Sequence, residues 1–240
     1  MSRSSDPRGA RRGVDDAVAA FAAGAPVLVH DAADREGEVD LVYPAVAVAA
    51  ADVARMRDDA GGLVCVALSD DVCATWELPF VRETLDHPAA GAHELSYGDR
   101  SSFSLTVNHR DTFTGITDED RALTISALGE AAAEVRRATA LAGDVARDAV
   151  AAGPEGFADR FRAPGHVHLL RAAPDLLADR RGHTELGVAL AEAAGVAPAV
   201  VVCEMLDEAD GALSPTAARA YADHNGLVYV EGSDLLERLD

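Results

Sequence analysis

Short apolar runs alternate with amphipathic or polar stretches along most of the chain. Apolar runs of about four to eight residues favour buried strands, whereas longer runs with apolar residues on one face favour helices. Strands and helices interleave without strict strand–helix–strand spacing. The pattern predicts an α+β fold: a single compact domain with a mixed, partly antiparallel β-sheet packed by helices. Strands are expected at residues 26–31, 41–44, 63–68, 102–108, 166–171, 198–205 and 227–230, and helices at 14–23, 50–60, 70–78, 118–133, 186–194 and 215–225.

The chain has 240 residues, of which 49% are hydrophobic, enough for one large domain or two small ones. We expect one catalytic domain over residues 13–240 and a disordered tail over residues 1–12. No apolar run is long enough to cross a bilayer, and no apolar secretion segment follows the N-terminal arginines. The expected location is the cytoplasm, without a membrane partner.

Acidic residues outnumber basic ones, with 41 Asp and Glu against 21 basic side chains and a net charge of −20 at pH 7. This balance makes nucleic acid a poor partner unless a local basic patch overrides it. The excess is rich in aspartate and is spread along the chain rather than gathered in a tail. We hypothesise a halophilic cytosol, because such a surface stays hydrated in concentrated salt.

Lysine is absent from the chain, so its cationic side chains are arginines. The absence excludes Schiff-base aldolases, a pyridoxal phosphate anchor and the lysine of a P-loop. A carbanion or enediol intermediate would need stabilisation by a metal or by hydrogen bonds. Cys65, Cys73 and Cys203 are too few and too scattered for a disulfide framework or a cysteine-rich zinc site. Cys65 and Cys203 lie in apolar runs and are expected to be buried thiols.

The segment Arg180-Arg181-Gly182-His183-Thr184-Glu185 is a basic loop that opens onto a helix-favouring run. The unpaired N–H groups and positive dipole end of a helix start can hold a phosphate. Arg180 can add a bidentate guanidinium and Thr184 a hydroxyl, while His183 could bind a metal or transfer a proton. An arginine-rich surface turn with Thr184 as the helix N-cap explains the segment equally well.

Two further stretches carry side chains suited to catalysis. The segment 34–40 holds four carboxylates and Arg35 between two apolar runs. Crowded oxygens of this kind suit Mg²⁺ or Mn²⁺, although a solvated acidic turn explains them as well. Glu204 ends the most apolar run, where an unpaired carboxylate is costly. Pro164-Gly165 predicts a tight turn before His166, which would be a general base or a hydrogen-bonded turn residue.

A polar stretch precedes the helix expected at 118–133. Thr117 is a good N-cap for this helix, with Asp120 three residues later as in a capping box. The acidic first turn suits the helix dipole. Capping leaves Thr114 and Gly115 unexplained.

In their order along the chain, these segments resemble the 3,4-dihydroxy-2-butanone 4-phosphate synthase family of riboflavin biosynthesis. The likeness spans about residues 14–235, and the GTP cyclohydrolase II domain of some members is missing, as in monofunctional members. Each piece is weak alone, but the shared order is hard to obtain by chance. The matching pieces are Asp34–Asp40, Leu63–Cys65, Thr114–Thr117, Ala163–Val167, Arg180–Glu185 and Cys203-Glu204.

The resemblance implies a lyase that converts D-ribulose 5-phosphate into L-3,4-dihydroxy-2-butanone 4-phosphate and formate, with Mg²⁺ or Mn²⁺. It implies a homodimer with active sites near the subunit interface, where Thr114 would lie. Glu36 and His183 match metal ligands, and His166 and Glu204 match positions essential for catalysis. Substrate contacts are expected from Arg35, Glu36, Asp40, Thr114, Arg180, Arg181, Gly182, His183, Thr184 and Glu204.

The chemistry that this resemblance implies suits the residues. A divalent ion on Glu36 and His183 could stabilise charge on the oxygens of a diol or ketone without lysine. Asp40, His166 and Glu204 offer groups for successive proton transfers, and we hypothesise that Asp40 handles an early proton and the other two act later.

The chain also departs from the family pattern. Arg181 stands where the family usually has glycine. If this position needs positive φ, Arg181 is strained; if it does not, Arg181 adds charge near the phosphate. Gly37 and Val39 replace an asparagine and a glycine in the acidic loop, and Ala163 stands where many members have arginine.

Other functions remain open at this point. One is another lysine-free, metal-dependent sugar-phosphate enzyme, such as an isomerase or a class II aldolase. Another is a non-catalytic phosphosugar-binding paralogue, which the loop substitutions would suit. A fold shared with RNA-modification enzymes is a remote option that the acidic balance disfavours.

Overall fold

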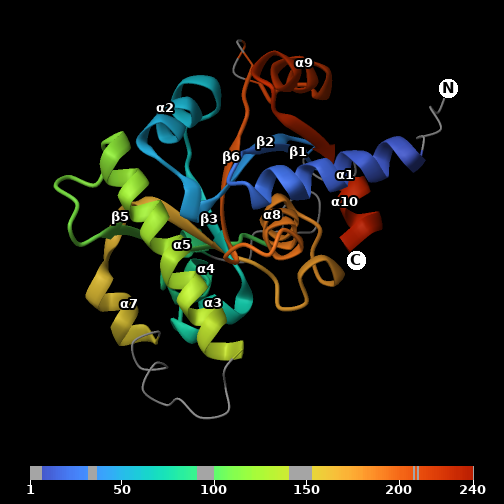
Figure 1. The fold of residues 1–240 in the computed structure, drawn as a ribbon. Coiled ribbons are helices and arrows are strands. Elements are labelled where there is room, and N and C mark those ends of the chain that lie inside the picture. The colour runs from blue at the N-terminus through green and yellow to red at the C-terminus, as the bar shows by residue number, and fades with distance from the viewer. Residues whose placement is uncertain are drawn as a thin grey trace.

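The fold is known from a computed structural model, which describes residues 7–31, 37–90, 100–140, 153–207, 209 and 211–239. Helices and strands interleave along the described chain (Figure 1). The strands are β1 (Val27–His30), β2 (Val39–Pro44), β3 (Cys65–Leu68), β4 (Phe103–His109), β5 (Phe161–Arg171), β6 (Ala199–Glu204) and β7 (Val228–Glu231). The helices are α1 (Pro7–Ala22), α2 (Ala50–Asp59), α3 (Asp70–Thr75), α4 (Val81–Thr84), α5 (Asp118–Ala140), α7 (Pro154–Arg160), α8 (His183–Ala193), α9 (Pro215–Asn225) and α10 (Gly232–Leu239), with short 3-10 turns at Ala45–Ala47, Pro88–Ala90 and Leu176–Ala178.

The strands form one sheet in the order β4-β5-β3-β6-β2-β1-β7. Neighbours run antiparallel except for two parallel pairs, β3 with β5 and β1 with β7. This mixed sheet, packed by helices in a single domain, confirms the predicted α+β class.

Both faces of the sheet are covered by helices. Strand alternation sends Leu41, Val66 and Val201 into a core shared with α2, α3, α5 and α9. Val42, Ala67 and Val200 face the opposite side, where α1, α8 and α10 pack (Figure 1). The nearly continuous burial of the central strands follows from this two-sided cover.

Capping residues in the sequence predicted the ends of some helices correctly. Residues 215–225 are helical as predicted, because Ser214 caps the start through Ala217 N–H at 3.3 Å and Gly226 closes the end at φ +65°. Helix α5 continues to Ala140, beyond the expected end at 133, since its alanine-rich sequence holds no helix breaker there. Helix α1 begins at Pro7, before the expected start. Residues 1–6 of the predicted tail lie outside the described residues.

The tight turn predicted at Pro164-Gly165 is wrong. Both residues lie inside β5, where its pairing with β4 is irregular. A Cβ on Gly165 would lie 2.0 Å from the carbonyl carbon of Val107, so glycine is needed here for close backbone approach rather than for chain reversal.

Among the described residues, no helix has both the length and the hydropathy that crossing a membrane would require.

Candidate active site

Two carboxylates from distant parts of the chain meet at one end of the sheet. Asp40 on β2 and Glu204 on β6 are direct partners in the antiparallel register. Both lie in phase with Val42 and Val202, which face α8. Strand pairing therefore places the two acids side by side, on the face where helix α8 begins.

The carboxyl group of Asp40 is unusually placed. The residue is 1% exposed, and neither carboxylate oxygen has a hydrogen-bond partner among the described residues. Burial raises the pKa of Asp40 to about 7, an effect opposed by His183 and reinforced by the nearby charge of Glu204. A carboxyl group that titrates near neutral pH can both accept and release a proton.

Helix α8 brings the basic segment to the same place. His183 is its first residue, and His183 Nδ1 lies 3.9 Å from Asp40 Oδ2. Arg180 precedes the helix and is held by Glu185, whose Oε2 accepts a hydrogen bond from Arg180 Nη1 at 2.8 Å. The other oxygen of Glu185 accepts the N–H of Ala173 at 3.0 Å. Glu185, which is fully buried, thus fixes the arginine against the end of β5.

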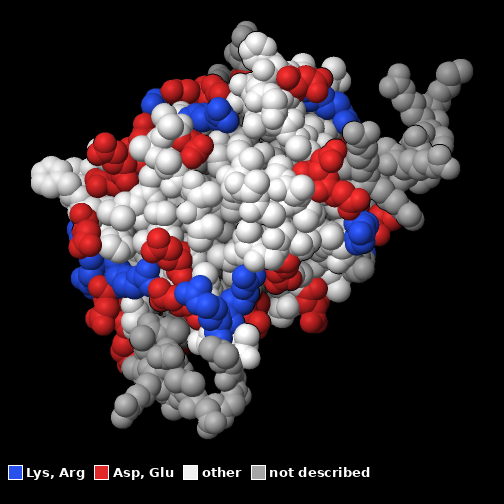
Figure 2. Space-filling view, in the orientation of Figure 1, with Lys and Arg blue, Asp and Glu red and all other residues white. Residues whose placement is uncertain are grey.

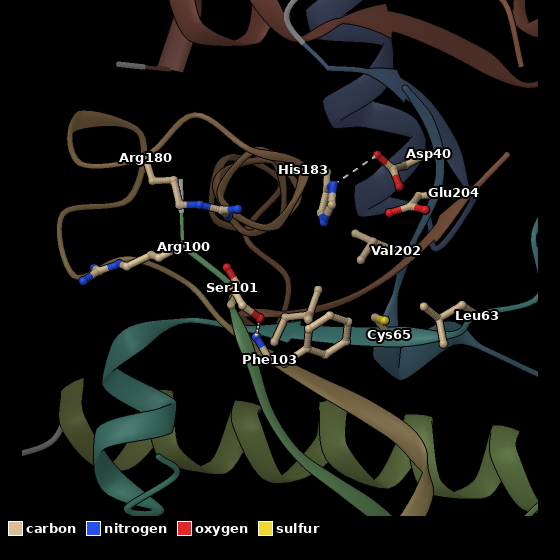
Figure 3. A pocket seen from close by; sticks show the side chains of 12 residues that line it. Asp40, Leu63, Cys65, Arg100, Ser101, Phe103, Arg180, His183, Val202 and Glu204 are labelled. Atoms are coloured by element: carbon tan, nitrogen blue, oxygen red, sulfur yellow. Dashed lines mark hydrogen bonds and ion pairs between the residues drawn. The ribbon is translucent and has the colours of Figure 1, made fainter. Parts of the chain in front are cut away.

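These side chains line one cavity of about 290 Å³, which is at the small end of the range for ligand pockets, about 300–1,000 Å³. Figure 3 shows its two ends. Asp40, His183 and Glu204 lie together at one end, and Arg180 and Arg100 lie at the other. Apolar side chains, among them Leu63, Cys65, Val202 and Phe103, complete the lining. We call this site the acid–arginine cavity.

Part of the cavity wall was missed in the sequence. Arg100, Ser101 and Ser102 line it from the residues just before β4. Arg100 also packs on the Phe80 ring, with its guanidinium carbon 5.5 Å from the ring centroid. The signal available was an arginine followed by two serines ahead of a strand, which by itself is an ordinary loop.

The remaining residues of the basic segment have different positions. Gly182 is the helix N-cap at φ −87°, so Thr184 is not the cap. Thr184 is fully buried, and its hydroxyl has no hydrogen-bond partner among the described residues. Arg181 is exposed, and its Nε lies 3.5 Å from the carbonyl oxygen of Leu177. The φ of Arg181 is not positive, so this position does not need glycine and Arg181 is not strained.

Of the two expected metal ligands, Glu36 and His183, the described residues include only His183. Arg35 and Glu36 lie outside the described residues, although Asp31 and Glu38, on either side of them, are joined by a hydrogen bond of 2.9 Å from Asp31 N–H. Within the described part of the chain, no three His, Cys, Asp or Glu side chains gather as a metal site. The donors present are His183 and the oxygens of Asp40, which have no hydrogen-bond partner among the described residues, and they are of the kinds that Mg²⁺ and Mn²⁺ accept.

Thr114 and His166 form a second group, away from the lining of the acid–arginine cavity. His166 on β5 is exposed, and its backbone N–H donates to Asn108 Oδ1 at 2.8 Å. Gly115, next to Thr114, packs so closely on Asn108 that an added Cβ would lie 2.0 Å from Asn108 Nδ2. We call Asn108, Thr114, Gly115, Asp120 and His166 the His166 cluster.

Asp120 explains the stretch that capping left open. Thr117 is the expected cap, since its Oγ1 accepts the N–H of Asp120 at 3.1 Å. The Asp120 carboxylate accepts the N–H groups of Phe113, Thr114 and Gly115 at 3.2, 3.0 and 2.7 Å, and the Thr114 hydroxyl at 3.2 Å. These bonds, led by the one from Gly115, lower the pKa of Asp120. One carboxylate thus shapes the loop that carries Thr114.

All three cysteines are buried thiols, as predicted for Cys65 and Cys203. Cys65 lines the cavity, but burial raises its pKa to about 12. The thiolate is therefore scarce at neutral pH, and Cys65 acts as a small apolar wall.

Comparison with known proteins identifies the family of the chain. The sequence profile of the 3,4-dihydroxy-2-butanone 4-phosphate synthase family matches residues 15–238. The chain belongs to this family. The 3,4-dihydroxy-2-butanone 4-phosphate synthase of Archaeoglobus fulgidus is 45% identical over 233 residues, which cover 93% of this chain and 92% of the relative. That of Methanosarcina mazei is 46% identical over 235 residues, covering 93% and 90%.

Solved structures of the family share the fold. A 3,4-dihydroxy-2-butanone 4-phosphate synthase in complex with two magnesium ions has a TM-score of 0.73 and 29% identity, covering 92% of this chain and 94% of that one. The Candida albicans synthase has a TM-score of 0.72 and 28% identity, covering 95% and 97%. Family membership over the whole described domain therefore rests on sequence and fold together.

Proposed function

We propose that this family member is a 3,4-dihydroxy-2-butanone 4-phosphate synthase, the lyase of riboflavin biosynthesis that converts D-ribulose 5-phosphate into L-3,4-dihydroxy-2-butanone 4-phosphate and formate. Family membership supports this activity. One structural observation carries it: Asp40, Arg180, His183 and Glu204, from three separate segments, line the same cavity.

The cavity has a polarity that suits a phosphorylated sugar. A phosphate would bind at the arginine end, where Arg180 and Arg100 supply positive charge. The sugar hydroxyls and carbonyl would then extend toward the end formed by Asp40, His183 and Glu204 (Figure 3). In this orientation, the reacting carbons lie among groups that can move protons.

The proposed roles follow from these positions. Asp40, with its pKa near 7, removes the early proton at C1 and can later return it. Glu204 lies opposite Asp40 and serves a later transfer. His166 acts on the substrate from the His166 cluster, and Arg35, Arg181 and Thr184 are retained as family-based substrate contacts.

We propose that Glu36 and His183 hold a divalent cation, Mg²⁺ or Mn²⁺. The hard oxygen and imidazole donors at this end of the cavity fit such an ion. When bound, the ion would stabilise negative charge on the sugar oxygens as a Lewis acid, in a chain without lysine.

The deciding experiment measures formate released from D-ribulose 5-phosphate, with and without EDTA. Formate release that EDTA abolishes and Mg²⁺ or Mn²⁺ restores supports the proposal. Turnover of the sugar phosphate without formate would indicate an isomerase or aldolase instead. Thermal stabilisation by the sugar phosphate without turnover would indicate a non-catalytic binding protein.

We further propose that two copies of the chain assemble so that the His166 cluster of one completes the acid–arginine cavity of the other. Thr114 and His166 of the cluster are exposed on one protomer, and Phe113 and Ile116 beside them are 94% and 52% exposed. Apolar side chains on a loop this well ordered by Asp120 are typical of an interface. Burying them would bring Thr114 and His166 to a second chain.

Mixing two inactive variants tests this assembly. His166→Ala and Glu204→Gln each damage one half of the site. If the halves come from different chains, a mixed dimer holds one intact site and one doubly damaged site, so activity returns on mixing. If each site is built within one chain, both sites of the mixed dimer stay damaged and mixing restores nothing. Sedimentation of the separate variants confirms that both still form dimers.

The acidic surface supports two further proposals. Figure 2 shows acidic side chains in several separate groups around the visible face rather than in one patch. With a net charge of −20, this surface disfavours nucleic acid and suits a salt-rich cytoplasm, where cations screen the repulsion. We therefore expect the thermal midpoint to rise with KCl. A midpoint unaffected between low and molar salt would contradict the halophilic proposal.

A further inference from the structure

Asn108 makes contacts to His166 that constrain its ring. Asn108 is 3% exposed on β4, and its Oδ1 accepts the backbone N–H of His166 at 2.8 Å. A backbone N–H can only donate, so this bond fixes the orientation of the amide. Turning the amide over would place its NH₂ against that N–H. Asn108 therefore keeps Oδ1 toward the backbone and Nδ2 on its other side.

The ring of His166 meets this oriented amide through Nδ1. Nδ1 lies 3.1 Å from Asn108 Nδ2 and 3.3 Å from Asn108 Oδ1. Nδ2 is a donor only, so a proton on Nδ1 would bring two donors head to head at the shorter contact. That proton could be accepted only by Oδ1, which is farther away at 3.3 Å and already accepts the backbone N–H. An unprotonated Nδ1 instead accepts a hydrogen bond from Nδ2. We propose that Asn108 fixes the tautomer of His166, so that the neutral imidazole carries its proton on Nε2 and presents that N–H outward.

Neighbouring atoms prevent the Asn108 amide from moving or rotating. Gly115 has φ +89°, and a Cβ there would lie 2.0 Å from Nδ2 and 2.6 Å from Oδ1 of Asn108. The amide is thus confined between the Gly115 backbone and the His166 backbone and ring. Asp120 in turn fixes Gly115 through the 2.7 Å bond to its N–H.

The tautomer changes the role expected of His166. The sequence alone is compatible with a general base or a hydrogen-bonded turn residue at His166. A neutral imidazole with its proton on Nε2 is instead a hydrogen-bond donor, which can polarise a carbonyl or stabilise charge that develops on oxygen. Asn108 is then a positioning residue that acts through His166. This catalytic consequence rests on the proposed function, whereas the tautomer itself does not.

Nitrogen NMR of the full-length protein tests the tautomer directly. In ¹⁵N-histidine-labelled protein, the His166 ring, assigned through His166→Ala, should show an unprotonated Nδ1 and a protonated Nε2 when neutral. This measurement on the unmodified chain does not depend on whether any Asn108 variant folds. A neutral ring with the proton on Nδ1 would overturn the proposal.

Asn108→Asp supplies the second measurement. Its carboxylate still accepts the His166 backbone N–H, but it offers Nδ1 only acceptor oxygens, so the tautomer should reverse. We expect kcat for formate release to fall by about 100-fold with KM within about threefold, as for loss of one positioned hydrogen-bond donor. Asn225→Asp, a surface amide on α9, is the matched control and should leave kcat and the His166 signals unchanged.

The outcomes separate the two proposals. No formate from the unmodified enzyme would refute the proposed function, yet the tautomer would still be decided by NMR. Formate production with an unchanged kcat in Asn108→Asp would leave the proposed function intact and overturn the role of Asn108.

Discussion

The acid–arginine cavity and the His166 cluster are built in different ways. The cavity rests on regular structure: Asp40 and Glu204 are held by strand register, and His183 by the first turn of α8. The His166 cluster rests on irregular structure: the register shifts between β4 and β5, Gly165 lies against the β4 backbone, and Gly115 lies against the Asn108 side chain. Burial tunes the first, since it raises the pKa of Asp40 to about 7. In the His166 cluster, hydrogen-bond geometry determines how the side chains are oriented. Substitutions in the acid–arginine cavity should therefore affect proton transfer and substrate binding. Substitutions in the His166 cluster should affect the position and orientation of His166.

The largest effect is expected from Asp40→Asn, which keeps the size of the side chain and removes its proton transfer. We expect kcat for formate release to fall by about 10²–10⁴-fold. The thermal midpoint should not fall, because the buried charge carries a desolvation cost that the amide avoids. Asp111→Asn, at an exposed position, serves as control. Activity within threefold of the unmodified enzyme would remove Asp40 from the mechanism.

Glu185→Gln should act mainly on substrate binding. The fully buried carboxylate holds Arg180 at 2.8 Å, and an amide cannot accept both Arg180 and the Ala173 N–H with two oxygens. The guanidinium loses its fixed position, so KM for D-ribulose 5-phosphate should rise by about tenfold, the loss of one charged hydrogen bond. Glu192→Gln, the same change on the exposed side of α8, is the control. A lower thermal midpoint with unchanged KM would make Glu185 purely structural.

Gly115→Ala tests whether the His166 cluster depends on close packing. The substitution combines a positive φ of +89° with a Cβ placed 2.0 Å from Asn108 Nδ2. We expect a loss of stability of about 1–2 kcal/mol from the backbone and a fall in kcat as Asn108 and His166 are displaced. Gly195→Ala is the matched control, because Gly195 has φ +70° and no atom within 4 Å of its added Cβ. Equal effects of the two variants would mean that only backbone strain matters.

The same contrast explains what could be predicted from the sequence. The start and end of α9 follow from Ser214, Pro215 and Gly226, which act within a few residues. The α+β class follows from the short apolar runs, which indicate buried strands, and from the helical patterns between them. The partnership of Asp40 with Glu204 joins residues far apart in sequence, and no local pattern carries that register. Family likeness supplied these residues, but not their contact.

The sequence-based predictions were wrong or incomplete at residues whose type suits more than one structural role. Pro164-Gly165 suits a turn, but Gly165 is there because β4 passes too close for a Cβ. Asn108 looked like one polar position of an alternating strand, and nothing in the alternation shows that its amide orients His166. Glu185 and Asp120 are acids in first helical turns, which explains their presence without revealing that they hold Arg180 and Thr114. Such roles depend on tertiary contacts.

The smallest effect is expected from Asp120→Asn, and it should depend on pH. Hydrogen bonds, led by that from Gly115 N–H, lower the pKa of Asp120 in the folded state. Its contribution to loop order is therefore complete above the ordinary Asp pKa of about 3.9 and is lost as the pH falls through the lower folded value. At pH 6, amide hydrogen exchange at Thr114 and Gly115 should be faster in the variant, and the difference should shrink as acid protonates the unmodified chain. Glu119→Gln, a neighbouring exposed acid, is the control. Exchange that is the same in both proteins at pH 6 would mean that the loop holds its shape without Asp120, and the order of the His166 cluster would then have to come from Gly115 and Asn108 alone.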